Sequence, residues 1–467
     1  MQREQLTGRS LPRRARLLGA LLGLAALLAA LPALPQGSGT PSTGPAGPAS
    51  SEVIRLGVER SSVPRVLVRL LPLEVVTDAP GAADAARLMA GRLARDLYFS
   101  GLIDIGQPLP PGVALPYTGG RSPRPEDATA PAYGIALRLE AAPGAGQVWV
   151  ARLLDPSGEM RISKRYTVEL PDFARSVHHF ADEVVMQLTG EQGISQTRIL
   201  FTRGHGDQRE LHIVDFDGEN LRQVTRNASL NLTPRWSPDG TQVAYTSYYR
   251  GRQRLMLLAS ATGQSTRIGD FQGLNLGPTW SPAGRELALT LSRDGNSEIY
   301  RIRPDGTIIQ RLTFEPSIEC SPCYDPSGKQ IAFTSDRTGS PQIYVMDTVG
   351  GGRQRITFEG SYNESAAWSP RGDRIAYVSR IDKKFTIFVL APDGSERQQV
   401  TFAQDRDNED PSWAPDGRHL VVSSNRSGYT NLWVLDVDSG EARPLTRGKG
   451  EDTGPSWSGA PGAARGR

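Results

Sequence analysis

A unit of about 44 residues occurs six times in the second half of the chain, and it constrains the fold more than any other feature. The text around Pro234–Gly240 returns with an aromatic residue at the same place, at intervals of 44, 44, 44, 45 and 44 residues. Short apolar runs separated by Asp and Gly turns, at about 11 residues per strand and connection, are typical of antiparallel β-structure. This pattern favours the four-stranded blade of a β-propeller over a helical solenoid. The six aromatic positions are Trp236, Trp280, Tyr324, Trp368, Trp413 and Trp457.

The two ends of the repeat region are complementary. The region opens at Ile199–Thr202 with a run that has the pattern of a second strand, whereas residues 455–457 form a first strand alone. Pairing of these ends would complete one blade and protect both open strand edges. The sequence therefore predicts a six-bladed, all-β propeller over residues 196–458, with one blade closed by N- and C-terminal strands.

A different pattern precedes the repeats. Val66–Val76 predicts a strand, and apolar residues at helical spacing, Leu88 among them, predict helices over Asp84–Phe99 and Asp172–Leu188. Three alternating runs between these helices predict an antiparallel meander. We therefore expect an N-terminal α/β domain over residues 52–195.

The first 35 residues predict a secretory signal peptide, because an arginine-rich start precedes Leu17–Leu31, which contains only Leu, Ala and Gly. At about 1.5 Å per residue this run is about 22 Å long, shorter than the roughly 30 Å hydrocarbon layer. The alternative, an uncleaved membrane anchor, is therefore the poorer interpretation, and stable membrane insertion after cleavage is not expected. Residues 36–51, rich in Pro, Gly and Ser, predict a mobile tether, and residues 459–467 predict a disordered tail.

Charge and composition exclude several partners. The chain carries a net charge of +3, and residues 1–35 contribute +4, so their removal leaves −1. A near-neutral chain lacks the basic surface that nucleic acid requires. Because the chain has two cysteines and its histidines are scattered, and because its Asp-Gly sequences are explained as hairpin turns, we expect neither a cofactor nor a dedicated metal site.

Two segments give the chain a resemblance to the TolB family, the periplasmic propeller component of the Tol-Pal system of Gram-negative bacteria. The stretch from His179 through Gly190 to Ile199 resembles the family's junction between the second helix and the propeller. Glu52–Leu56 resembles the start of the family's mature members. The resemblance, which covers about residues 52–457, implies a non-enzymatic periplasmic protein that binds the Pal lipoprotein through the propeller and TolA through its N-terminal segment. We expect a monomer that supports outer-membrane integrity and its invagination during cell division.

The loops that lead into the six innermost strands are predicted to bind Pal, because in a propeller they ring the central channel and meet at one place. Five residues before each aromatic position stand the polar residues Asn231, Asn275, Glu319, Asn363, Asn408 and Asp452. Apolar neighbours are suited to the core of a docking surface. The alternative is that the polar side chains cap strand ends. The predicted Pal-binding residues are Asn231, Leu274, Asn275, Leu276, Gly277, Ile318, Glu319, Asn363, Glu364, Asn408 and Glu409.

The resemblance also implies a TolA-binding segment near the mature start. The alternation of its side chains suits addition of a strand to a partner's sheet edge, and the preceding tether would give it reach. The alternative is an ordinary first strand of the α/β domain. The predicted TolA-binding residues are Glu52, Val53, Ile54, Arg55, Leu56 and Val58.

Two further expectations can be tested by structure. Cys320 and Cys323 are predicted to form a disulfide, because the periplasm is oxidising and a Cys-x-x-Cys span can close around a proline turn. The alternative function is a secreted propeller hydrolase or lyase that uses carboxylates at the channel mouth. Two buried channel carboxylates with raised pKa values would favour that enzyme, whereas a wide, partly apolar mouth would favour protein docking.

Overall fold

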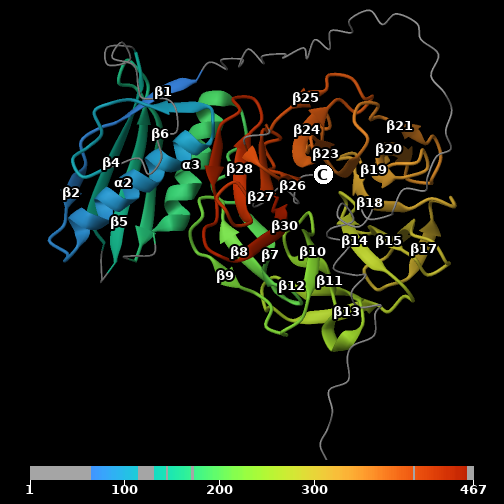
Figure 1. Ribbon diagram of the computed structural model, residues 1–467. Coiled ribbons are helices and arrows are strands. Elements are labelled where there is room, and N and C mark those ends of the chain that lie inside the picture. Colours follow the sequence, from blue (N-terminus) through green and yellow to red (C-terminus); the bar gives the residue numbers. More distant parts are fainter. Residues whose placement is uncertain (1–64, 114–130, 143–145, 170–172, 403–404, 460–467) are drawn as a thin grey trace, which may run out of the picture. The chain divides into compact units, whose positions relative to one another are not determined.

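The computed structural model describes residues 65–113, 131–142, 146–169, 173–402 and 405–459 (Figure 1). The predicted signal peptide, tether and TolA-binding segment lie outside these residues, as does the predicted tail beyond Gly459. In the part of the chain that is described, no helix has the length and apolar character needed to cross a membrane.

A six-stranded sheet and two helices form the N-terminal part. Its elements are β1 (Val66–Leu70), β2 (Glu74–Val76), α2 (Ala82–Phe99), β3 (Ile103–Ile105), β4 (Tyr133–Ala141), β5 (Gln147–Leu154), β6 (Met160–Val168) and α3 (Ala174–Thr189). β1 pairs in parallel with β3 and β4, and β2 also pairs in parallel with β4. β4, β5 and β6 form the predicted antiparallel meander.

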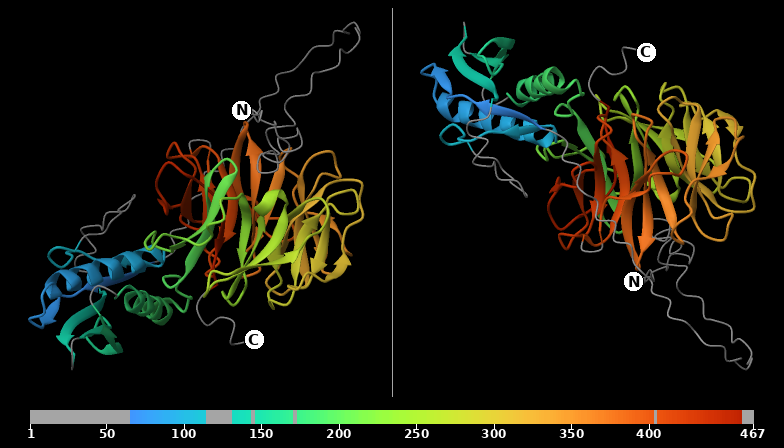
Figure 2. Two further views of the ribbon diagram at one scale, coloured as in Figure 1. Left: turned by 90° about the horizontal axis from the view of Figure 1, so that it is seen from below. Right: turned by 90° about the horizontal axis from the view of Figure 1, so that it is seen from above.

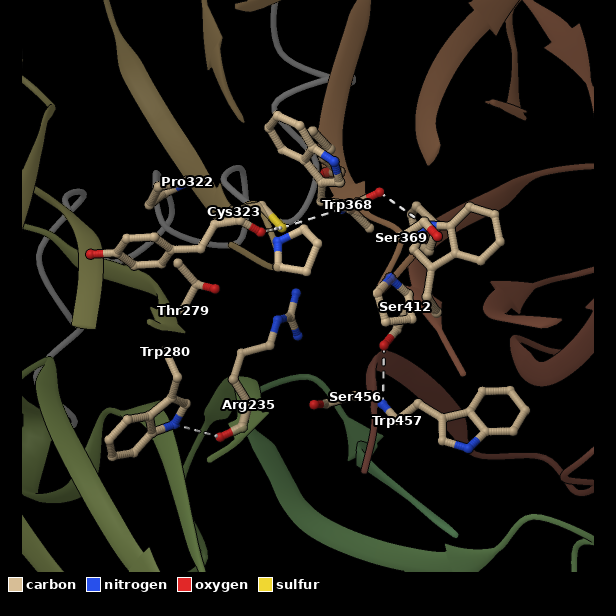
Figure 3. Close-up of a pocket in the computed structure, with 18 of the residues that line it drawn as sticks. Arg235, Thr279, Trp280, Pro322, Cys323, Trp368, Ser369, Ser412, Ser456 and Trp457 are labelled. Carbon is tan, nitrogen blue, oxygen red and sulfur yellow. Dashed lines mark hydrogen bonds between the residues drawn. The ribbon is translucent and has the colours of Figure 1, made fainter. Parts of the chain in front are cut away.

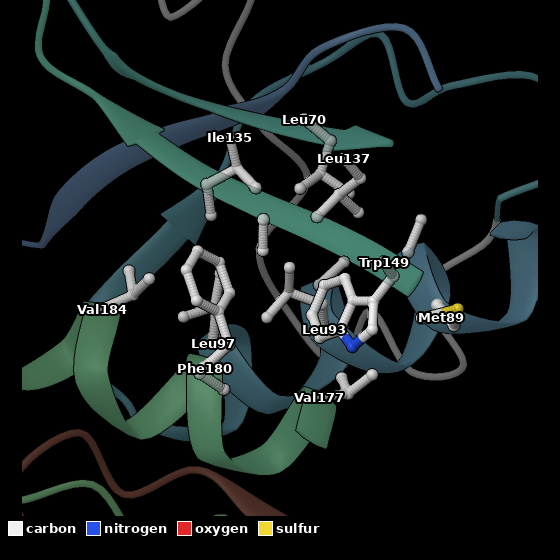
Figure 4. Close-up of a cluster of buried hydrophobic side chains, with 14 of the residues drawn as sticks. Leu70, Met89, Leu93, Leu97, Ile135, Leu137, Trp149, Val177, Phe180 and Val184 are labelled. Atoms are coloured by element: carbon white, nitrogen blue, oxygen red, sulfur yellow. The ribbon is translucent and has the colours of Figure 1, made fainter. Parts of the chain in front are cut away.

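The two helices and the sheet enclose one apolar core (Figure 4). Leu93 and Leu97 of α2 and Phe180 of α3 are fully buried in it, next to Trp149 of β5. The prediction that Leu88 belongs to the buried stripe is wrong, because its side chain is 64% exposed. Alanines of α2 are buried on the face of the helix that packs against the core, since small side chains allow the helix to approach its neighbours closely.

Five propeller blades are each built from four consecutive antiparallel strands. The first two are β10 (Asn231–Trp236), β11 (Gln242–Ser247), β12 (Arg254–Ala259) and β13 (Ser265–Gly269), then β14 (Asn275–Trp280), β15 (Leu287–Leu291), β16 (Glu298–Ile302) and β17 (Ile308–Arg311). The third and fourth are β18 (Glu319–Tyr324), β19 (Gln330–Ser335), β20 (Gln342–Asp347) and β21 (Gln354–Arg355), then β22 (Asn363–Trp368), β23 (Ile375–Ile381), β24 (Lys384–Leu390) and β25 (Gln398–Gln399). The fifth is β26 (Asn408–Trp413), β27 (His419–Ser424), β28 (Asn431–Asp436) and β29 (Ala442–Pro444).

The sixth blade combines strands from both ends of the propeller, as predicted. Its strand order is β30 (Glu451–Trp457), β7 (Arg198–His205), β8 (Gln208–Asp215) and β9 (Arg222–Gln223). In Figure 1 the last strand, β30, lies beside β7, so the C-terminal strand supplies the innermost position of a blade that begins more than 200 residues earlier. The shared blade closes the propeller and removes two open strand edges.

The propeller has two faces, which the innermost strands define. We call ring face the one on which these strands begin, at Asn231 and its five counterparts. We call turn face the one on which they end, in turns such as Ser237–Gly240. Figure 2 shows the propeller edge-on, with the sheets of the blades running between its two faces.

A network of ion pairs and aromatic contacts joins α2 and α3 to the propeller. Arg95 donates to Asp217 at 2.6 Å, and His178 Nδ1 lies 2.6 Å from Asp96 Oδ2. The guanidinium of Arg443 lies 4.1 Å from the ring centre of Phe99. Burial lowers the pKa of Arg443 to about 10. His178, the more buried of the two histidines of the α/β part, also packs edge-on against Phe216 of the propeller, so it takes part in the packing of the two parts of the fold.

Candidate functional site: the ring face and the central channel

Each innermost strand contains a β-bulge at the same place. The pairing with the second strand shifts register there in all six blades. The bulged residue has a left-handed backbone in every blade, with φ between 47° and 59°. A bulge bends a strand and redirects its side chains, so the repeated irregularity turns this edge of each blade toward the channel. The six residues are Thr233, Gly277, Ser321, Ser365, Asp410 and Gly454.

The polar ring lies two residues before these bulges, and the structure places it in the interior. All six ring side chains are 0% exposed. Five of them, Asn231, Asn275, Glu319, Asn363 and Asn408, were predicted to contact Pal; they offer no exposed side-chain surface in this structure, and their contact with Pal stays a prediction. The repeat register did place the six residues at equivalent positions, but it carries no signal that separates a buried cap from an exposed contact.

The buried ring side chains tie the loops of the ring face to the strands. Asn231 accepts a hydrogen bond from Ser247 Oγ at 2.7 Å and donates one to the carbonyl of Arg209 at 2.8 Å. Glu319 accepts hydrogen bonds from Ser335 at 2.7 Å and from Arg337 at 2.8 Å. These hydrogen bonds are the ones that the alternative interpretation expects, in which the ring side chains cap strand ends.

The other predicted Pal-binding residues have accessible surface. Ile318 is 37% exposed, and Leu274, Leu276, Glu364 and Glu409 are half-buried. Gly277 is one of the six bulged residues and lines the turn-face side of the channel. Nothing in the structure tests whether they bind Pal, so their role stays a prediction.

Three exposed phenylalanines on the ring face were missed by sequence reasoning. Phe314, Phe358 and Phe402 each follow a buried threonine after the fourth strand of successive blades, and they are 65%, 70% and 41% exposed. Arg311 lies 4.6 Å from the ring centre of Phe314, and Arg355 lies 5.3 Å from that of Phe358. Their repetition at intervals of 44 residues was the signal available in the sequence. Large apolar side chains exposed in one register mark an interaction surface.

Two carboxyl groups on neighbouring innermost strands have strongly raised pKa values. Burial raises the pKa of Glu364 to about 7, with a further contribution from Asp410. Burial, followed by the charges of Asp410 and Glu364, raises the pKa of Glu409 to about 8. Tyr362 donates a hydrogen bond to Glu364 at 2.9 Å. This pair is the feature that the alternative enzyme hypothesis required.

The raised pKa values predict that stability falls as pH rises. Between about pH 4.5 and 8 the folded protein holds protons at Glu364 and Glu409 that the unfolded chain releases, so the free energy of unfolding decreases with increasing pH. Glu409→Gln removes one of these carboxyl groups. Between pH 5 and 9, wild type should lose about 2 kcal/mol more stability than the variant, since the shift is worth several kcal/mol before screening by solvent.

Urea unfolding at pH 5, 7 and 9 would measure this difference, with Glu169→Gln, a change of an exposed residue in the α/β part, as the control. Parallel pH profiles for wild type and Glu409→Gln would show that the carboxyl group titrates normally.

The structure corrects the predicted disulfide, because Cys320 and Cys323 are free thiols. Both lie in β18 on opposite sides of its bulge, and the two residues pair with Thr334 and Ala332 of β19. Cys323 Sγ accepts a hydrogen bond from the Trp368 backbone N–H at 3.3 Å, which directs it toward the next blade. Burial raises the pKa of the Cys320 thiol to about 12, so this group is a poor nucleophile.

Among the described residues, one group has ligand atoms close enough to share a metal ion: Asp96, His178 and Asp217. Arg95 already pairs with Asp217, and Asp96 is hydrogen-bonded to His178. These contacts among Asp96, His178 and Asp217 belong to the network that joins α2 and α3 to the propeller.

Comparison with known proteins identifies the family. The model of the TolB beta propeller domain matches residues 185–460, more than half of the chain. The Protein TolB homolog of Chlorobaculum tepidum is 39% identical over 114 residues, which are 24% of this chain and 26% of that protein. The Tol-Pal system protein TolB of Desulfosudis oleivorans is 42% identical over 101 residues, 21% of this chain and 23% of that protein. The chain thus spans about a quarter of the length of these curated relatives.

A solved structure shows the same fold over a longer stretch. The crystal structure of TolB from Acinetobacter baumannii superposes with a TM-score of 0.71 at 24% identity, covering 85% of this chain and 97% of that chain. With six four-stranded blades, a C-terminal strand that closes the shared blade, and a family match over residues 185–460, this chain belongs to the TolB family.

Proposed function

We propose that this protein is a periplasmic, non-enzymatic component of a Tol-Pal system, which binds the Pal lipoprotein through the ring face and TolA through residues 52–58. In this role it would support outer-membrane integrity and the invagination of the outer membrane during division. The observation that carries the Pal proposal is the set of exposed apolar side chains on the ring face. Ile318 and the three exposed phenylalanines belong to the loops of consecutive blades.

The chemistry of this surface suits a protein partner. Aromatic side chains contribute large apolar area at a small cost in conformational entropy, and they are frequent in the centres of interfaces. The arginines that lie over Phe314 and Phe358 add charge beside the apolar contacts. The buried ring holds the loops that carry them, so the surface is supported by the hydrogen bonds of the strand caps.

A second candidate function is favoured by one observation. The raised pKa values of Glu364 and Glu409 would allow one carboxyl group to act as a general acid and another as a base, as a hydrolase or lyase requires. We favour docking because burial of two neighbouring carboxyl groups is sufficient to raise both pKa values. Family membership also supports docking, since the relatives carry the name of the Tol-Pal system.

Deletion of residues 36–60 tests the assignment of the two partners to two surfaces. The variant should lose TolA binding, because the deletion removes the segment that would add to TolA as a strand. It should retain Pal binding and nearly the same melting temperature, because it leaves the described blades intact. Isothermal titration with purified TolA and Pal would measure both affinities. Equal loss of both affinities, or retention of TolA binding, would contradict the assignment.

A further inference from the structure

A pocket of about 390 Å³ opens where the innermost strands approach the turn face. Residues from all six innermost strands line it, so it is the turn-face part of the central channel. Figure 3 shows the side chain of Arg235 extending into this space, with Thr279, Cys323, Ser412 and Ser456 around it.

Arg235 breaks the pattern of the repeat at this level. It stands one residue before the aromatic position of its blade, where the other five blades have small side chains. Small residues leave the channel open, whereas Arg235 places a guanidinium group in it. The five counterparts are Thr279, Cys323, Ala367, Ser412 and Ser456.

The guanidinium of Arg235 has few partners. Its Nη1 donates to the carbonyl oxygen of Pro234 at 2.9 Å, and within the described ranges no carboxylate lies within ion-pair distance of it. Asp410 is the acidic group that interacts with it electrostatically, but Asp410 Oδ2 accepts a hydrogen bond from the backbone N–H of Gly454 at 3.0 Å. Burial lowers the pKa of Arg235, so its charge is held in surroundings that compensate it only in part.

Two hydroxyl groups near Arg235 retain protons to donate. Ser456 Oγ accepts the backbone N–H of Trp236 at 3.2 Å, and Ser412 Oγ accepts that of Trp457 at 3.0 Å. In the part of the chain that the structure describes, neither hydroxyl has an acceptor for its own proton. The pocket therefore combines a cationic fork with neutral donors, which is the chemistry that binds an oxyanion.

We propose that the turn-face pocket binds a monocarboxylate, held by the guanidinium of Arg235 and by the hydroxyl groups of Ser412 and Ser456. A planar guanidinium matches the two oxygens of a carboxylate. The single cation and the nearby Asp410 disfavour a doubly charged phosphate. Proline and tryptophan side chains that also line the pocket suit a short apolar group next to the carboxylate. A small free acid or the C-terminal carboxylate of a peptide would supply this chemistry.

Saturation-transfer NMR on the full chain would test the proposal with propionate and with N-acetyl-trialanine, each compared with its amide at constant ionic strength. Both carboxylates should bind, and their amides should not. If N-acetyl-trialanine binds and propionate does not, the pocket takes a peptide terminus, and the reverse result identifies a small acid. Arg235→Gln should weaken carboxylate binding at least ~10-fold, because the charge-assisted contact is lost. Arg235→Lys should restore part of it.

Arg285→Gln is the matched control, because Arg285 is exposed on the turn face outside the pocket. This variant should bind carboxylates as wild type does. Equal binding of acid and amide, no binding of either carboxylate, or unchanged affinity in both Arg235 variants would overturn the proposal. Pal binding is proposed for the opposite face, so its loss or retention is measured independently.

Discussion

Replacement of Asp452 by alanine is expected to lower the free energy of unfolding by about 3 kcal/mol. Asp452 is fully buried in β30 and accepts two hydrogen bonds from Arg203 of β7, at 2.6 and 2.7 Å. It also accepts one from Thr446 at 2.6 Å. The substitution would leave a largely buried guanidinium without its partner, at the contact that closes the propeller. Chemical unfolding at pH 7 would measure the change.

Glu451→Ala is the control for this prediction. Glu451 is the preceding residue of β30 and pairs with Arg209, but its side chain is 45% exposed. Exposed ion pairs contribute about 0–1 kcal/mol, so this variant should be nearly as stable as wild type. If the two variants lost the same stability, the buried pair would not be what holds the closing strand in place.

The double change Phe314→Asp and Phe358→Asp should weaken Pal binding by at least about 2 kcal/mol, which is about 30-fold. Both side chains are exposed, so their replacement removes no core contact. At a desolvated interface centre, however, an aspartate loses the aromatic contact and becomes buried without a partner. Glu319 is not a suitable site for such a test, because it is buried in a hydrogen-bonded network and its replacement would disturb the fold.

Val349→Asp is the matched control for the ring face. Val349 is 65% exposed, the same as Phe314, but it lies in the turn between β20 and β21 on the turn face. The Val349→Asp variant should therefore bind Pal with the same affinity as wild type. Isothermal titration would measure the Pal affinity of both variants, and their melting temperatures would verify that they fold. If Val349→Asp weakened binding and the phenylalanine double variant did not, Pal would dock on the turn face.

The fold was predictable because its signals are repeated. Six aromatic positions at nearly constant spacing, together with turn residues between apolar runs, leave few arrangements other than blades. The second-strand pattern at Ile199–Thr202 also predicted the shared blade, which the pairing of β30 with β7 confirms. Leu88 was misassigned because helical periodicity alone does not say which of two adjacent faces a helix buries.

The site was less predictable, because exposure depends on contacts between blades. Asn and Glu five residues before an aromatic are typical both of a strand cap and of an exposed loop, and only the structure shows them buried. The disulfide failed for a similar reason, since Cys-x-x-Cys spacing does not reveal that a bulge separates the two residues. Arg235 and the three phenylalanines are visible in the repeat register once blades are compared position by position.

Hydrogen-exchange mass spectrometry of the full chain, with and without purified Pal, tests the central proposal most directly. Pal should slow exchange in the ring-face loops that precede the innermost strands, above all in residues 312–319 and 356–363. Exchange on the turn face, including residues 347–352, should not change. Protection confined to the turn face or to the α/β part, or no protection at saturating Pal, would contradict the account.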